Sequence, residues 1–143
     1  MTPVTFTLDP RLATDTVWLC DWPLCSILLM NDSRYPWLIL VPQRNGLTEA
    51  FDLAPKEQAQ LWREVTHAAE LLKAATQCRK INIGALGNAV SQLHVHVIAR
   101  NPDDYAGLGP VWGNGATERY EATVLENVMH RFTSILHPPC PIS

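Results

Sequence analysis

Short apolar runs separated by turn residues dominate the first third of the chain. Residues 16–20, 24–30 and 37–41 are rich in β-branched and other apolar side chains, which favours strands. The segment between the last two runs, residues 31–36, has the Asn, Asp, Ser and Pro content of a turn. Strands joined by so short a turn are expected to pair in the antiparallel sense.

The spacing of apolar residues becomes helical over residues 54–77. Pro55 suits the first turn of this helix, because a residue there needs no N–H donor. The apolar positions recur on one stripe: Leu61, Val65, Ala68, Ala69 and Leu72. The charged residues fall largely off that stripe and are expected to face solvent: Glu57, Arg63, Glu64 and Lys73.

The remainder of the chain repeats this order of strands and then a helix. Residues 80–85 and 90–99 predict two further strands, and residues 117–136 predict a C-terminal helix. The proline-rich tail, residues 137–143, cannot be helical. This order favours an α+β fold with an antiparallel sheet of about five strands and two main helices. A chain of 143 residues has the size of one domain, so residues 1–143 are expected to form a single unit.

Composition and charge narrow the classes of function. The chain has 11 basic and 14 acidic residues and no basic stripe, so it is not expected to bind a nucleic-acid polymer. No apolar run approaches the roughly 20 residues of a membrane span, and the first residues do not form a signal peptide. The four cysteines are scattered without a C-x-x-C pair, which favours free thiols in a reducing compartment. We therefore expect a cytoplasmic protein that binds no membrane.

A row of polar residues in the last predicted strand carries the candidate chemistry. Side chains alternate between the faces of a strand, so the apolar residues of the segment 90–99 face the core. The polar residues share the other face at intervals of about 7 Å: Gln92, His94 and His96. Such a row can be an ordinary half-exposed strand, a metal site built on His94 and His96, or an imidazole nucleophile with its neighbours. A metal site needs a third protein ligand, and no other histidine has an obvious place beside the row.

The segment just before this row favours the nucleophile. Residues 84–88 read Gly-Ala-Leu-Gly-Asn, and glycines let a backbone turn tightly and approach a ligand closely. Consecutive N–H groups in such a turn can bind an anion. A plain β-turn would also use these glycines, but beside two alternating histidines the segment predicts a phosphate pocket that faces an imidazole.

These features together resemble the histidine triad (HIT) family of nucleotide hydrolases and transferases. The family motif has three histidines that alternate with apolar residues after a Gly-Gln-Ser/Thr-Val segment. Residues 87–98, Gly-Asn-Ala-Val-Ser-Gln-Leu-His-Val-His-Val-Ile, match it in spacing. Residues 27–42 look like the family's strand, turn and strand, and residues 82–84 look like the Asn-x-Gly that opens its phosphate loop. The resemblance covers residues 26–100 and implies a HIT-like fold and a homodimer, with no cofactor.

Carried over by position, the resemblance implies a role for each matching residue. His94, the middle histidine, would attack the α-phosphorus of a nucleotide and form a nucleotidyl-histidine that water then hydrolyses. His96 would contact the phosphate and help to orient the site. Further phosphate contacts would come from side-chain amides: Asn82, Asn88 and Gln92. The ribose hydroxyls would be bound by Asn31 or by the neighbouring Asp32.

Three positions depart from the family pattern. Gln92 replaces the first histidine, Trp37 stands where many members have another histidine, and Ala89 replaces the usual hydroxyl residue. Three functions therefore stay open: a hydrolase of nucleoside phosphoramidates or dinucleoside polyphosphates, a HIT-fold nucleotide-binding protein with little or no catalysis, and a metal-binding H-x-H protein. Among the aromatic residues, Trp112 in its Gly/Pro loop is the best placed to reach the site or a partner subunit.

Overall fold

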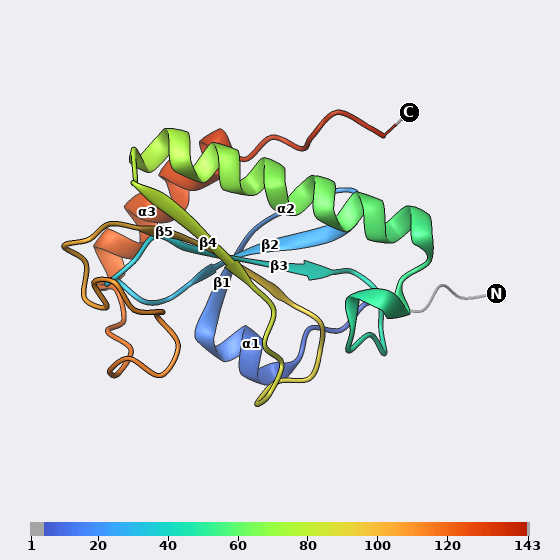
Figure 1. Ribbon diagram of the computed structural model, residues 1–143, viewed down its shortest axis with the longest axis horizontal. Coiled ribbons are helices and arrows are strands. Elements are labelled where there is room, and N and C mark those ends of the chain that lie inside the picture. Colours follow the sequence, from blue (N-terminus) through green and yellow to red (C-terminus); the bar gives the residue numbers. More distant parts are fainter. Residues whose placement is uncertain (1–4, 143) are drawn as a thin grey trace.

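The apolar runs of the first third pair as an antiparallel meander. In the computed structural model, which describes residues 5–142, β1 (Thr16–Asp21), β2 (Cys25–Met30) and β3 (Trp37–Pro42) lie side by side (Figure 1). The connections between them are too short for a crossover, so each strand turns back on the one before it. A short helix, α1 (Pro10–Asp15), precedes β1.

Two later strands complete the sheet. β5 (Val95–Arg100) pairs with β3, and β4 (Lys80–Gly84) lies outside β5 at the edge. The strand order is β1-β2-β3-β5-β4, with every pair antiparallel. The predicted antiparallel sheet of about five strands is therefore confirmed. Its centre is β3 and β5, whose residues are all buried.

The helices divide the molecule into layers. A short 3₁₀ helix, η1 (Ala50–Asp52), leads into the long helix α2 (Pro55–Thr76), and α3 (Ala122–Ile135) follows late in the chain. Figure 1 shows α2 and α3 on one side of the sheet and α1 on the other. Alternate residues of β5 reflect this division: Val95 and Val97 pack into the core beneath α2 and α3, whereas Ile98 packs into a second core on the α1 side.

Several boundaries differ from those predicted. The last strand begins at Val95 rather than near residue 90. In the chain before it, the Leu93 N–H donates to the Leu47 oxygen, and the Gln92 side chain bonds to the N-terminal segment. The C-terminal helix begins at Ala122 rather than near residue 117. Helix α1 was missed, although Asp9 followed by Pro10 is a typical helix start: the Asp9 side chain accepts a hydrogen bond from the Arg11 N–H.

The expected solvent exposure of Glu64 is wrong. Its carboxylate is fully buried and accepts hydrogen bonds from the N–H groups of Leu24 (3.0 Å) and Cys25 (2.9 Å), at the start of β2. The amide of Gln60 donates a third hydrogen bond to it. The carboxylate thus satisfies two main-chain donors at the start of a buried strand.

All four cysteines are free thiols. None of the helices in residues 5–142 is long and apolar enough to cross a membrane. The proline-rich tail is irregular through residue 142. Residues 1–4, on which the prediction of no signal peptide partly rests, and residue 143 lie outside the described range.

Candidate functional site

The two histidines of the row lie together at the start of β5. His94 immediately precedes the strand and His96 is its second residue. Their rings have centroids 5.0 Å apart in an edge-to-face arrangement, and both side chains are buried (7% and 6% exposed). The predicted alternation therefore places them as neighbours on one face, but in a covered site instead of on an open surface.

His94 is held in a single tautomer. The distance between its Nδ1 and the main-chain oxygen of Gln92 is 2.6 Å. A carbonyl oxygen can only accept a hydrogen bond, so Nδ1 carries the hydrogen in this contact. In the neutral ring Nε2 then has the free electron pair. An oriented imidazole with a free Nε2 is the form that attacks an electrophile.

His96 is held in the opposite tautomer. The indole Nε1 of Trp37 donates a hydrogen bond to His96 Nδ1 at 3.0 Å. An indole N–H can only donate, so Nδ1 is the acceptor and the neutral ring carries its hydrogen on Nε2. Burial, and next the nearby His94, lower the pKa of His96 to about 3. His96 is therefore a neutral hydrogen-bond donor at neutral pH.

Aromatic rings enclose His96. Trp37 lies at a centroid distance of 5.6 Å, and Trp112 lies edge-on at 5.3 Å. Gly84, opposite His96 in the β4–β5 ladder, makes room for this approach: a Cβ at Gly84 would lie 2.8 Å from Trp112 Cη2. The expectation that Trp112 reaches the site agrees with this position.

Gln92 binds the N-terminal segment through both ends of its amide. Its Oε1 accepts a hydrogen bond from the Asp9 N–H at 2.8 Å, and its Nε2 donates one to the Thr7 oxygen at 2.9 Å. Arg11 donates to the Ala89 oxygen at 2.6 Å, so the segment contacts the loop before β5 at a second point. The sequence analysis missed this role of residues 7–11, since no local pattern reports contacts about 80 residues apart.

The loop before His94 forms one wall of a small cavity. A cavity of about 110 Å³ is lined by His94, Gly87, Ser91 and Glu49, with neighbours from the same loop and from η1. Gly87 has a φ of +76°, a conformation that favours glycine. Asn88 follows it and is exposed.

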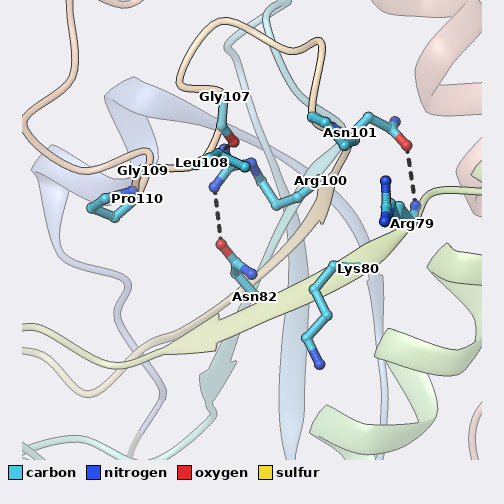
Figure 2. A pocket seen from close by; sticks show the side chains of 10 residues that line it. Arg79, Lys80, Asn82, Arg100, Asn101, Gly107, Leu108, Gly109 and Pro110 are labelled. Atoms are coloured by element: carbon cyan, nitrogen blue, oxygen red, sulfur yellow. Dashed lines mark hydrogen bonds between the residues drawn. The ribbon is translucent and has the colours of Figure 1, made fainter.

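Asn82 lies farther along the same face. It pairs with Ile98, and its Oδ1 accepts a hydrogen bond from Arg100 at 2.9 Å. Arg100 is in turn bound by both carboxylate oxygens of Asp104, at 2.7 and 3.0 Å. Figure 2 shows Asn82 and Arg100 in a cavity of about 570 Å³, beneath the loop at Gly107. Asn82 lines this cavity, not the one at His94.

The two predicted ribose ligands have partners within the protein. Asn31 Oδ1 accepts a hydrogen bond from the Tyr120 N–H at 2.9 Å. Asp32 is buried and forms an ion pair with Arg34, with 2.8 Å between Asp32 Oδ2 and Arg34 Nη2. The structure thus brings His94, His96 and Gln92 together and leaves Asn82, Asn31 and Asp32 in other contacts. Their ligand roles stay predictions.

The residues described offer no ready metal centre. Within residues 5–142, no three or more His, Cys, Asp or Glu side chains are grouped so that they could hold an ion. The two histidines are instead bonded to a carbonyl and to an indole, which occupies Nδ1 of each ring. This arrangement gives the metal-binding interpretation no support.

Comparison with protein families shows which family the chain belongs to. The model of the HIT domain matches residues 11–103, which is more than half of the chain. The chain belongs to the HIT family. The resemblance seen in the sequence is therefore confirmed, and so is the HIT-like α+β fold.

Solved structures of HIT proteins agree closely with the chain. A histidine triad protein of Sinorhizobium meliloti is 50% identical over 92% of this chain and 98% of its own, with a TM-score of 0.89. A histidine triad protein of Marinobacter aquaeolei is 38% identical over 93% of this chain and 97% of its own, with a TM-score of 0.90. A Sulfolobus tokodaii structure is described as a hypothetical histidine triad nucleotide-binding protein. It shares the fold with a TM-score of 0.66, at 13% identity over 87% of this chain and 85% of its own. No curated protein matches the sequence.

In this HIT protein the three positions singled out in the sequence lie in connected contacts around the two histidines. Trp37 bonds to His96, Gln92 provides the main-chain acceptor for His94, and the oxygen of Ala89 binds Arg11. Of the three, only Trp37 orients a histidine through its side chain, because Gln92 and Ala89 take part in these contacts through their main-chain oxygens.

Proposed function

We propose that this HIT protein binds a nucleotide and hydrolyses a nucleoside phosphoramidate or a dinucleoside polyphosphate through a covalent bond to His94. The observation that carries the proposal is the 2.6 Å contact between His94 Nδ1 and the Gln92 oxygen, which leaves Nε2 with a free electron pair. Nucleotide binding is supported by membership of the HIT family and by the description of the Sulfolobus tokodaii protein.

The tautomers of His94 and His96 support a reaction in two steps. His94 Nε2 attacks the α-phosphorus, a nitrogen–phosphorus bond forms, and the bond to the leaving group breaks with its electron pair. Water then attacks the same phosphorus, the nitrogen–phosphorus bond breaks, and a nucleoside monophosphate and the neutral imidazole result. His96 Nε2–H is a fixed donor that can bond to a non-bridging phosphate oxygen as its charge grows.

A substitution of the nucleophile tests the proposal. His94→Ala is expected to bind nucleotide and to lose turnover by at least about a thousandfold, because no other side chain takes over the attack. His130→Ala is the matched control, since His130 is an exposed histidine of α3. Wild-type protein denatured at alkaline pH should carry a nucleoside monophosphate on the peptide that contains His94, because a phosphorus–nitrogen bond to imidazole is stable in alkali but hydrolysed in acid. Turnover by His94→Ala at the wild-type rate would refute the proposal.

The alternative is a HIT-fold protein that binds nucleotide with little or no catalysis. It is favoured by the side chain of Gln92, whose amide is fully occupied by the N-terminal segment and carries no proton to transfer. Nucleotide affinity without turnover or adduct, across phosphoramidates and polyphosphates, would establish this alternative.

We also propose that the protein is a homodimer in the cytoplasm. β4 is an edge strand whose Ile83 is 39% exposed, and Trp62 of α2 is 61% exposed. An edge strand and exposed apolar side chains suit pairing with a second copy, and four free thiols suit a reducing compartment. Light scattering should give about twice the 16.0 kDa chain mass. Ile83→Lys should halve that mass, whereas Val124→Lys on α3 should not. A monomeric wild-type protein would refute the dimer.

A further inference from the structure

The side chains around His94 determine which leaving groups the site can expel. When the bond to phosphorus breaks, its electron pair goes to the leaving group. A phosphate or nucleotide departs as a stable anion, because its last ionisation has a pKa of about 6. An amine must gain a proton as it departs, since an amide anion is far too basic to be released into water. Efficient cleavage of a phosphoramidate therefore needs a general acid beside the scissile bond.

Gln92 occupies the place in the row next to His94 and cannot act as that acid. A carboxamide does not ionise near neutral pH. Its two ends are also committed, with Oε1 bonded to the Asp9 N–H and Nε2 to the Thr7 oxygen. The amide is thus held toward the N-terminal segment and has no free rotation toward a leaving group.

The side chains next to Gln92 do not supply a general acid either. Ala89 has only a methyl side chain. His96 is neutral, and its pKa of about 3 leaves almost none of its conjugate acid at neutral pH. The hydrogen on His94 Nδ1 is bonded to the Gln92 oxygen, on the side of the ring away from Nε2.

The ionised groups near His94 also lack a proton to give. Hydrogen bonds from the Arg11 main chain and side chain hold the pKa of Asp9 below its ordinary value, so Asp9 is a carboxylate beside the Arg11 guanidinium. Three other polar residues line the cavity at His94: Thr48, Glu49 and Ser91. Glu49 is the one carboxyl group in that lining, so it has to be tested directly.

We propose that the site is selective for substrates whose leaving group departs as an anion, and that Gln92 sets this selectivity. The substrate class is then the mixed anhydride of a nucleoside monophosphate, such as a dinucleoside polyphosphate, in preference to a phosphoramidate. This inference rests on the proposed function and narrows its substrate class.

A substrate series with one common nucleoside 5′-phosphoryl group tests the inference. The leaving groups are an amine, phenols of graded acidity, and a nucleoside diphosphate. Wild-type kcat/KM is expected to rise steeply with leaving-group acidity and to favour the nucleoside diphosphate over the amine by at least about a hundredfold, the usual contribution of a general acid. Gln92→His introduces a group that can be protonated and should reduce this ratio by at least about tenfold.

A matched variant distinguishes the effect of supplying a proton from the effect of loosening the N-terminal segment. Asn45 accepts a hydrogen bond from the Thr7 N–H and donates one to the Thr5 oxygen, so Asn45→Ala frees the same segment without adding an ionisable group. Asn45→Ala should leave unchanged the ratio of kcat/KM with the nucleoside diphosphate leaving group to kcat/KM with the amine. Glu49→Gln should also leave it unchanged.

The outcomes are distinct. Efficient amine release by the wild type, with no dependence on leaving-group acidity, would overturn the inference while His94-dependent turnover upheld the proposed function. A ratio that changed equally in Gln92→His and Asn45→Ala, or a phosphoramidate activity lost in Glu49→Gln, would also overturn it. Absence of turnover and of adduct with every substrate would overturn the proposed function and the inference together.

Discussion

Trp37 and His96 are joined by a hydrogen bond across the centre of the sheet, 3.0 Å from indole Nε1 to imidazole Nδ1. Trp37 pairs with Ile98 and His96 pairs with Ile39, so the two side chains are diagonal neighbours on one face of β3 and β5. Trp37 therefore fixes the tautomer of His96, and its ring packs against the imidazole together with Trp112.

Replacing the indole of Trp37 should remove the hydrogen bond that fixes the tautomer of His96. Trp37→Phe keeps an aromatic ring but removes the donor, so His96 Nδ1 becomes a buried acceptor without a partner. We expect the pKa of His96 to rise and kcat/KM to fall by about tenfold, the effect of one lost hydrogen bond of about 1.4 kcal/mol. Nitrogen NMR of the imidazoles and steady-state kinetics measure the two effects. Trp18→Phe, in the exposed part of β1, is the control, and an unchanged His96 tautomer would contradict the prediction.

Stability should depend on pH through His96. In the unfolded chain this histidine takes up a proton near its ordinary pKa of 6.5, whereas in the folded protein it does so only near 3. The folded state therefore binds fewer protons between these values, and the free energy of unfolding rises with pH across this range. The contribution is complete above pH 6.5 and is lost as the pH falls toward 3.

Urea unfolding at pH 7, 5.5 and 4.5 measures this dependence. The wild type should lose a few kcal/mol over the range, and His96→Gln should lose less. His130→Gln, which changes an exposed histidine, should keep the wild-type dependence. Equal losses in the wild type and His96→Gln would show that His96 is not the responsible group.

The close approach of Trp112 depends on Gly84. Gly84→Ala would place a Cβ 2.8 Å from Trp112 Cη2, so the indole must move away from His96. We expect a loss of about 1–3 kcal/mol in the free energy of unfolding, as for other overpacked sites, together with a shift in tryptophan fluorescence. At Gly109 a new Cβ would make only ordinary contacts at 3.5 Å, so Gly109→Ala is the control. Equal stability of the two variants would contradict this account of Gly84.

The buried carboxylate of Glu64 should be essential for stability. Glu64→Gln replaces one acceptor oxygen with an NH₂ group that faces a main-chain donor of β2. The expected loss in the free energy of unfolding is about 2–4 kcal/mol. Glu70→Gln, an exposed position on the same helix, should change it by less than about 0.5 kcal/mol. Chemical denaturation of the two variants would decide the matter, and equal midpoints would refute a structural role for Glu64.

The features that follow from a local period could be predicted from the sequence. The alternation of Val95, His96 and Val97 places the imidazole opposite the core, and this prediction holds because side chains alternate along any strand. The strands and the long helix follow from the same kind of pattern. The family match adds the HIT-like fold, which the order of elements alone gave only as α+β.

The features that depend on distant contacts could not be predicted. Glu64 looked like a solvent-facing residue because its acceptor role depends on Leu24 and Cys25, which lie some 40 residues away. The contacts of Gln92 with Thr7 and Asp9 are likewise long-range. Helix periodicity reports which side of a helix a residue is on, but it does not report an unpaired main-chain donor that approaches from another element.

The pairing of β3 with β5 also has a consequence for protein synthesis. Trp37 and His96 are separated by 59 positions, so β1, β2 and β3 can leave the ribosome and form their meander well before β5 has been translated. Throughout that interval the free edge of β3, whose residues are all buried in the finished fold, is open to pairing with another nascent chain. The segment that carries the two histidines is the one that covers this edge. Its arrival covers this edge and brings His94 and His96 into the site in the same step.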